Sequence, residues 1–267
     1  IVLDYVFVGR LKMGILGAAL ATILGLLLSF IMGVYYFIKS PNTLHFTWHP
    51  LSVKTAFRCA VNGLSEFVNQ IAIAITTIVF NRTAMIFAGE DGIAAVSIIM
   101  YLQFLCIGVY FGFSMGIAPP LGYAYGDKKI DVCMILEKYA RRFFCTAPLV
   151  IYALTYFLAP TGVSFFAEKN SIVYELAVTG MRIYGLGFLF SGINIFSSIR
   201  MMAYGKGYFS GIITFLRSFA LLLLFLPVFF GLNRIWLAVP LAEFFTLFLS
   251  VVSLIAFPKK DALLMYP

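Results

Sequence analysis

The sequence predicts an all-α membrane protein, a polytopic helical bundle of seven transmembrane helices. Of its 267 residues, 62% are hydrophobic and only 11% are charged, and the mean hydropathy is +1.00. A soluble domain would carry about 25% charged residues. The apolar residues gather in segments of the ~20 residues that a helix needs to cross about 30 Å of hydrocarbon. These observations exclude a soluble globular domain.

Seven apolar segments have this length: about 14–38, 60–82, 92–118, 140–160, 172–199, 209–230 and 235–257. The basic residues in the intervening loops predict the orientation of the chain. Twelve lie on one side: Lys39, Lys54, Arg58, Lys128, Lys129, Lys138, Arg141, Arg142, Arg200, Lys206, Lys259 and Lys260. Five lie on the other: Arg10, Lys12, Arg82, Lys169 and Arg234. This bias predicts a multi-pass protein of the inner (plasma) membrane with a cytoplasmic C-terminus, and it explains the net charge of +8 without a nucleic-acid partner.

The second segment carries a polar stripe along its length. The polar residues recur at steps of three, four and seven and therefore share one helix face: Asn62, Glu66, Asn69, Gln70, Thr76, Thr77 and Asn81. Lipid cannot satisfy these side chains, so the stripe must face a water-filled cavity or other protein. The pattern indicates transport. Asn69 and Asn81 are candidates for lining a substrate cavity, although such amides also hold helices together.

Three residues are candidates for proton or cation coupling. Glu66 lies about two turns inside the cytoplasmic end of its segment, where a carboxylate can exchange a proton. A hydrogen-bonded residue near the interface is the structural alternative. Gln70 lies one turn further along the same face, and Glu243 lies two turns inside the last segment. Glu243 could serve either coupling or packing.

The fifth segment contributes further cavity candidates. Arg182 lies at about mid-depth and needs a partner there. Glu175 precedes it by seven residues on the same face, so an ion pair that fixes helix packing is as plausible as substrate contact. A different face, suited to a cavity, carries Ser191, Asn194 and Ser198. Arg217, near the cytoplasmic start of the sixth segment, is expected to extend its charged group to the interface.

Nothing in the sequence argues for an enzyme or a bound cofactor. No Ser/His/Asp arrangement, Gly-rich nucleotide loop or His/Cys cluster is present. Cys59, Cys106, Cys133 and Cys145 lack metal-ligand spacing and are expected to be structural thiols. We therefore expect no cofactor and no metal beyond a coupling ion, H+ or Na+.

A short internal repeat suggests how the chain is built. Residues 13–30 and 230–250 share a pattern of apolar, Gly and small residues at an offset of 217. Many secondary transporters consist of such repeated halves, with the substrate path between them. On this interpretation the chain holds one six-helix half and the last helix of the preceding half.

A set of ordered motifs resembles a known family. The motifs are GLSEF (63–67), FN (80–81), GEDGIAA (89–95), SMGIAP (114–119), GYAYGD (122–127), GMRIY (180–184), GIN (192–194), YGK (204–206) and GLNRIWLAVPLAE (231–243). Together with LDYVFV (3–8) and GILGAALAT (14–22), they resemble the multidrug and toxic compound extrusion (MATE) family, in particular its bacterial small-drug efflux branch. The resemblance covers essentially the whole chain and depends on the order of the motifs.

The resemblance implies a twelve-helix, two-lobe transporter, of which this chain supplies helices six to twelve. Residues 1–39 would form the last helix of the N-terminal lobe, 40–59 the cytoplasmic inter-lobe loop, 60–258 the C-terminal lobe and 259–267 a cytoplasmic tail. The N-terminal lobe is then an expected partner, beside the lipid bilayer and a small amphipathic substrate. By resemblance, Glu66 or Gln70 stands where relatives carry a coupling carboxylate. Some relatives have an Asp near Ser191, and its absence here favours H+ over Na+.

The leading functional prediction is therefore a cation-coupled antiporter that exports drugs or other lipophilic, often cationic compounds by alternating access. A flippase for lipid-linked oligosaccharides or other lipids, built on a related fold, is the first alternative, and it predicts a strongly basic central cavity. A seven-helix receptor or sensor is the alternative from another class, but it leaves the internal repeat unexplained.

Overall fold

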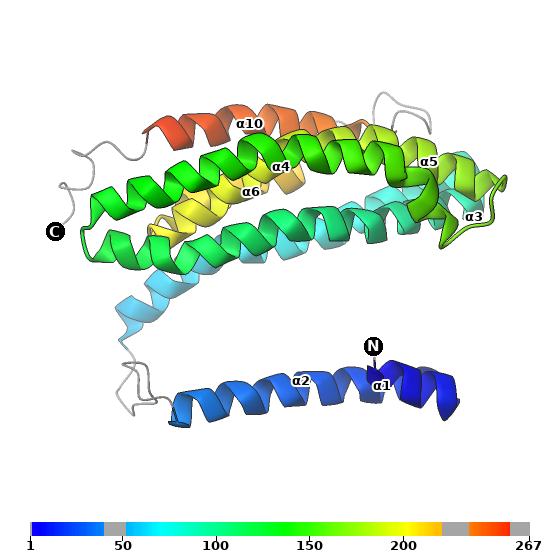
Figure 1. Ribbon diagram of the computed structural model, residues 1–267, viewed down its shortest axis with the longest axis horizontal. Helices are drawn as coiled ribbons and strands as arrows, with labels where there is room; N and C mark the ends of the chain where they lie inside the picture. Colours follow the sequence, from blue (N-terminus) through cyan, green and yellow to red (C-terminus); the bar gives the residue numbers. More distant parts are fainter. Residues whose placement is uncertain (1, 40–51, 221–234, 257–267) are drawn as a thin grey trace. The chain divides into compact units, whose positions relative to one another are not determined.

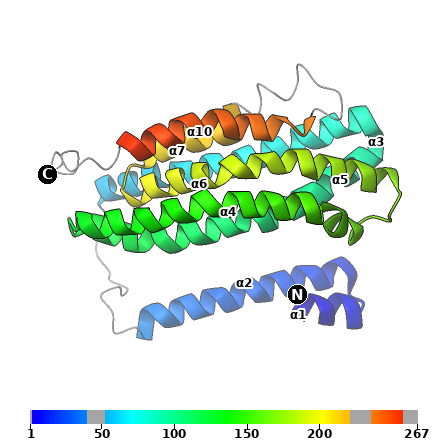
Figure 2. The same ribbon diagram turned by 45° about the horizontal axis from the view of Figure 1, so that its top comes forward.

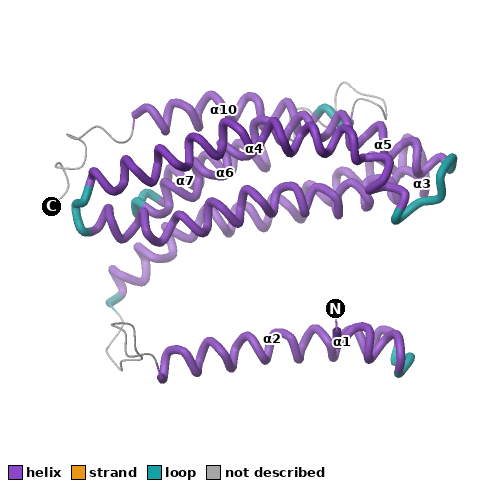
Figure 3. The backbone as a smooth tube through the Cα atoms, viewed as in Figure 1, coloured by secondary structure: helices purple, strands orange, loops and turns teal. Residues whose placement is uncertain are grey.

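The computed structural model describes residues 2–39, 52–220 and 235–256, and the regular elements in these ranges are helices (Figures 1 and 3). The chain divides into two compact units, Ile1–Val53 and Lys54–Pro267. The boundary follows the predicted inter-lobe loop, of which residues 40–51 lie outside the described ranges. The division into a terminal N-lobe helix and a six-helix C-lobe stays a prediction.

The first unit contains α1 (Val2–Asp4), a π-helical turn η1 (Tyr5–Arg10) and the long helix α2 (Gly14–Lys39). The chain turns back between η1 and α2, and Gly14 adopts a φ of +55° there. Gly17 lets α2 pack on η1, because a Cβ would lie 3.1 Å from the carbonyl carbon of Phe7. Only Gly17 and Ala21 of α2 are buried within this structure, as expected of an apolar helix that packs in a membrane.

The second unit begins with α3 (Val53–Gly126), which covers two of the predicted segments. The helix reverses at Gly89, whose φ of 60° and ψ of −144° are accessible to glycine and not to other residues without strain. The two halves of α3 therefore run out and back (Figure 1). Gly92 makes the reversal tight, because a Cβ there would lie 2.6 Å from the carbonyl oxygen of Ala84.

The remaining helices follow in chain order. They are α4 (Ile130–Ser164), α5 (Ile172–Tyr184), the 3-10 turn η2 (Gly185–Gly187), α6 (Phe188–Ala203), α7 (Gly207–Phe215), the π-helical turn η3 (Leu216–Ala220) and α10 (Ala238–Ala256). α5, η2 and α6 together form the predicted segment 172–199. The predicted segment 209–230 is described only to residue 220.

Helix α6 lies at the centre of the second unit. It packs against α4, α7 and α10, and Tyr110 of α3 donates a hydrogen bond to the carbonyl oxygen of Phe188 at its start (Figure 2). Its residues from Ser191 to Met201 are buried with one exception. A central helix with this position places its polar side chains inside the bundle.

Five helices of the described residues are long and apolar enough to cross a membrane: α2, α3, α4, the α5–α6 run and α10. Since α3 comprises two antiparallel halves, it accounts for two predicted segments. The prediction of an all-α polytopic membrane bundle is confirmed.

Candidate functional site

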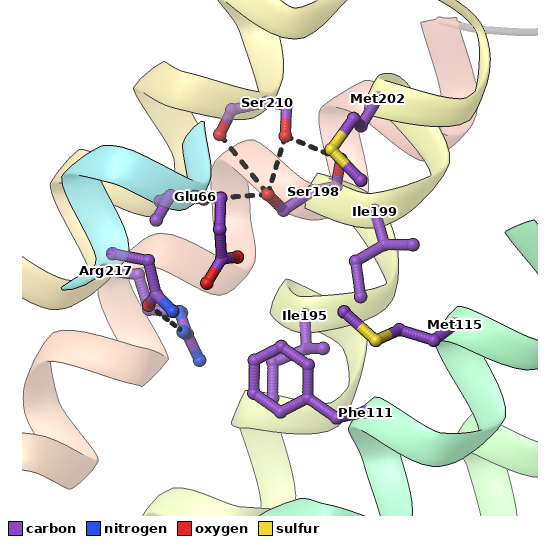
Figure 4. A pocket seen from close by; sticks show the side chains of 11 residues that line it. Glu66, Phe111, Met115, Ile195, Ser198, Ile199, Met202, Ser210 and Arg217 are labelled. Carbon is purple, nitrogen blue, oxygen red and sulfur yellow. Dashed lines mark hydrogen bonds between the residues drawn. The ribbon is translucent and has the colours of Figure 1, made fainter. Parts of the chain in front are cut away.

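A small cavity opens in the second unit among α3, α6, α7 and η3 (Figure 4). Its volume is about 30 Å³, which is room for one or two water molecules. The apolar part of its lining consists of Phe111, Met115, Ile195, Ile199 and Met202. The polar part consists of Glu66, Asn69, Ser198, Ser210, Thr214 and Arg217. The cavity is therefore suited to water, a proton or a small ion and not to a drug-sized molecule.

A buried polar network extends from this cavity into the bundle. Arg217 of η3 lies at its centre and donates one hydrogen bond to Glu243 Oε1 and one to Asn69 Oδ1, each 3.3 Å long. Glu243 of α10 also accepts from Asn194 Nδ2 through Oε2, at 2.6 Å. The network thus joins four elements, and Asn194 and Glu243 lie behind the cavity lining.

The ion pair in this network is largely shielded from solvent. The side chains of Arg217 and Glu243 are 11% and 8% exposed. The interpretation that Arg217 extends to the interface is wrong: its guanidinium points inward because Glu243 and Asn69 satisfy it there. An Arg that points inward would carry the cost of an unpaired charge in an apolar environment, and its bonds to Glu243 and Asn69 avoid that cost.

Hydroxyl groups form the wall of the cavity between α6 and α7. Ser198 Oγ lies 2.8 Å from Ser210 Oγ and 2.7 Å from Thr214 Oγ1. Ser210 Oγ also donates to the carbonyl oxygen of Ser198, at 2.7 Å. The polar face that the sequence predicted around Ser198 is therefore satisfied by α7.

Glu66 stands at the exposed side of the same cavity. Its carboxylate points toward the cavity on the side of Arg217 in Figure 4. Gln70 donates a hydrogen bond to Glu66 Oε1 at 2.7 Å, and both residues are exposed. No ion pair joins Glu66 to Arg217 among the described side chains. The structure thus places Glu66 in the lining of the cavity that Arg217 borders, and Glu243 in contact with Arg217.

Three other predicted cavity residues lie apart from this site. Ser191 and Asn81 are placed elsewhere on α6 and α3, and Ser191 Oγ and Asn81 Oδ1 are buried without a hydrogen-bond partner among the described residues. Arg182 packs over the ring of Tyr156, 4.9 Å from its centroid, and its Nε donates to the Tyr156 carbonyl oxygen. The alternative that Arg182 pairs with Glu175 is wrong: Glu175 is exposed, and Tyr156 takes its place.

A second buried ion pair was not predicted from the sequence. Arg200 is fully buried, and its Nε lies 2.5 Å from Glu137 Oε1, which also accepts a 2.5 Å hydrogen bond from Tyr204. The count of Arg200 among the loop residues is therefore wrong, although the charge bias keeps its direction without it. Glu137 shares the inward face of α4 with Cys133, Ala140 and Phe144, and this spacing was the signal that the sequence offered.

Comparisons with known proteins agree with this architecture. The family model MatE matches residues 67–228, more than half of the chain. No curated protein matches the sequence. Three solved structures share the fold, and each match covers 98% of this chain and 60% of the solved chain. The first is a MATE protein in complex with MaL6, with 20% sequence identity and a TM-score of 0.86. The second is a multidrug resistance MATE family transporter of the MOP superfamily in its outward-facing conformation (20% identity, TM-score 0.84), and the third is a MOP superfamily transporter from Pyrococcus furiosus described as having a binding pocket of reversed polarity (21% identity, TM-score 0.85).

The length of the match bears on what this chain represents. It spans about 60% of the length of these solved chains, as expected for one lobe and the adjoining helix of a two-lobe transporter. The matched family model covers most of the second unit, including α3, α4, α5, α6 and α7. The chain belongs to the MatE family, and its fold is that of a part of a MATE transporter.

Proposed function

We propose that the protein containing this chain is a secondary active antiporter that exports lipophilic, often cationic compounds in exchange for a cation, with H+ favoured over Na+. The observation that carries the proposal is the buried Arg217–Glu243 pair, whose Arg217 lines a water-sized cavity together with Glu66 within an apolar bundle. Membership of the MatE family and the multidrug resistance MATE relative support the substrate class.

The charges of this arrangement are unequal. Arg217 pairs with Glu243, and the second carboxylate at the cavity, Glu66, has no ion pair among the described side chains, so one carboxylate lacks a matching positive charge. Protonation of Glu243 would remove the partner of Arg217 and draw the guanidinium toward Glu66 across the cavity. A single bound proton or monovalent cation therefore restores neutrality, which is the property that a coupling site requires.

The groups around Glu243 favour a proton over a metal ion. Asn194 Nδ2 and Arg217 Nη1 both present N–H groups to the carboxylate, whereas a hard cation requires oxygen ligands. Within residues 2–39, 52–220 and 235–256, no group of three or more His, Cys, Asp or Glu side chains is arranged to hold a metal. A proton needs only the carboxylate and a path of water, and the cavity beside Arg217, the partner of Glu243, has room for water.

The flippase alternative receives less support. It predicts a strongly basic cavity, but the cavity described here contains one Arg, which is paired, and one Glu. In the α5–α6 span, Arg182 is held by Tyr156 and Arg200 is paired with Glu137. Location in the inner membrane with a cytoplasmic C-terminus stays part of the proposal, supported by the loop-charge bias.

The test is dye efflux from cells that express the full-length protein, native or with Glu243→Gln or Glu66→Gln, at several external pH values and Na+ concentrations. We expect both variants to lose efflux while native activity follows pH and not Na+. Glu175→Gln is the matched control, since it removes an exposed carboxylate that lies outside the network. Normal efflux by well-expressed Glu243→Gln protein would reject the coupling role of the network, and Na+-dependent native efflux would reject the proton.

A further inference from the structure

Three basic residues gather on the outward face of α4. Lys138, Arg141 and Arg142 are exposed and line a shallow, open depression together with Phe143, Cys145 and Thr146. Their spacing of three and four residues places them side by side on one helix face. The opposite face of α4 carries Glu137, Ala140 and Phe144, which pack into the bundle. The depression therefore belongs to the surface that faces away from the lobe interior.

The position of this cluster along α4 corresponds to the edge of the hydrocarbon. Residues 143–167 carry no charged side chain, whereas Lys138, Arg141 and Arg142 immediately precede them. At about 1.5 Å per residue, such an uncharged stretch is long enough to cross roughly 30 Å of hydrocarbon. The three cations thus lie at the level of the lipid headgroups, on the side that the charge bias makes cytoplasmic.

Most of the positive charge of the cluster is not neutralised by the residues that the structure describes. Glu137, the nearest acid, points inward and binds Arg200 and Tyr204 at 2.5 Å, and Arg141 approaches its other oxygen only to 3.9 Å. Neither Lys138 nor Arg142 forms an ion pair with an acidic side chain in the described part of the chain. Lys138 and Arg142 therefore remain available to an external anion at the headgroup level, and Arg141, held only at 3.9 Å by Glu137, lies beside them.

Uncharged residues continue the same exposed face toward the middle of the span. Cys145 and Thr146 border the depression, and Leu149 and Val150 beyond them are 64% and 56% exposed. A ligand that fits this surface has an anionic head beside the cations and an apolar tail along α4. Arg side chains hold phosphate oxygens in pairs, and basic pockets of this kind bind anionic headgroups.

We propose that Lys138, Arg141 and Arg142 form a binding site for the headgroup of an anionic phospholipid, whose acyl chains lie along the exposed face of α4. The site lies on the exposed face of α4, with Arg141 nearest Glu137, and is formed by residues other than those of the coupling network. It therefore does not depend on the proposed transport function.

The experiment is native mass spectrometry of the full-length protein in detergent, titrated with phosphatidylglycerol or phosphatidylcholine. The variant Lys138→Gln/Arg141→Gln/Arg142→Gln is compared with Lys54→Gln/Arg58→Gln/Lys128→Gln, which removes three other exposed cations from the same predicted side. We expect native protein and the control to bind phosphatidylglycerol at least about tenfold more tightly than phosphatidylcholine, and the first variant to lose this preference.

Three results would overturn the proposal: an equal loss in both triple variants, no preference for phosphatidylglycerol in native protein, or full displacement of the lipid by millimolar inorganic phosphate. The last result would show an anion site without a role for the acyl chains. If the triple variant fails to fold, the single variant Arg142→Gln replaces it in the titration, because this change removes one exposed cation and leaves the core intact. It should weaken phosphatidylglycerol binding by a smaller factor in the same direction.

Discussion

The second unit contains two buried Arg–Glu pairs that differ in how completely they are enclosed. Glu137 and Arg200 lie 2.5 Å apart with side chains 3% and 0% exposed. Glu243 and Arg217 lie 3.3 Å apart with side chains 8% and 11% exposed, and Arg217 borders a cavity. The first pair is closed on all sides, whereas the second has space beside it.

The residues around the two pairs also differ in how completely they enclose and satisfy the charges. Around Glu137–Arg200, Tyr204 donates to the carboxylate, and Arg200 Nη1 donates to the carbonyl oxygen of Ser253. This set ties α4, α6 and the end of α10 together. Around Glu243–Arg217, a second carboxylate, Glu66, lines the same cavity as the guanidinium. A closed, satisfied pair suits a structural clamp, and a pair with an alternative partner and a water-sized space suits exchange.

The largest expected effect comes from breaking the closed pair. Glu137→Gln leaves the Arg200 guanidinium buried without its counter-charge, which should lower the free energy of unfolding by about 3–5 kcal/mol. Thermal denaturation of the full-length protein in detergent measures this change in the free energy of unfolding. Arg141→Gln is the control and should change stability by less than about 0.5 kcal/mol, because Arg141 is exposed and 3.9 Å from Glu137. A Glu137→Gln protein as stable as the control would contradict the clamp.

Removal of both charges of the closed pair should cost less than removal of one. The double variant Glu137→Met/Arg200→Met leaves no uncompensated charge, so we expect a coupling energy of about 1–3 kcal/mol between the two positions. A double-mutant cycle with both single variants measures this energy by denaturation. Strict additivity of the two single effects would mean that the residues do not act as a pair.

The open pair should separate stability from activity. Glu243→Gln keeps the shape of the side chain, and water in the cavity can solvate Arg217, so the stability loss should be about 1–2 kcal/mol. Efflux, in contrast, should fall at least about tenfold if Glu243 carries the proton. Parallel measurement of melting temperature and dye efflux checks both. A loss of stability as large as that of Glu137→Gln would remove the distinction between the two pairs.

The smallest expected effect concerns the hydroxyl wall of the cavity. Ser198→Ala removes a group bonded to Ser210 and Thr214 and should destabilise the protein by about 1 kcal/mol. The half-buried Ser164 provides the control, because Ser164→Ala removes a hydroxyl whose hydrogen bond is exposed and goes to a carbonyl of its own helix. Equal melting temperatures for the two variants would show that the hydroxyl cluster does not hold α6 to α7.

The sequence predicted the individual helices well because their signal is local. The length of each apolar segment indicated the spans, and the three- and four-residue spacing of the stripe put Glu66 and Asn69 on one helix face, where the structure has both in the lining of one cavity. Gly89 was recognised only as part of a motif, although its positive φ is what turns α3 back on itself. The depth of Glu243 in the last span was evident from the sequence, but its partner was not.

What the sequence by itself determined is therefore the all-helical membrane fold and the face of each helix that carries polar groups. Only the tertiary structure decided which faces meet: Arg217 with Glu243 and Asn69, and Arg200 with Glu137 and Tyr204. Periodicity reports the direction of a side chain about its own helix axis and says nothing of the neighbour in that direction. In an apolar bundle that neighbour decides the role of an Arg, because a charge within it must find its partner inside the protein.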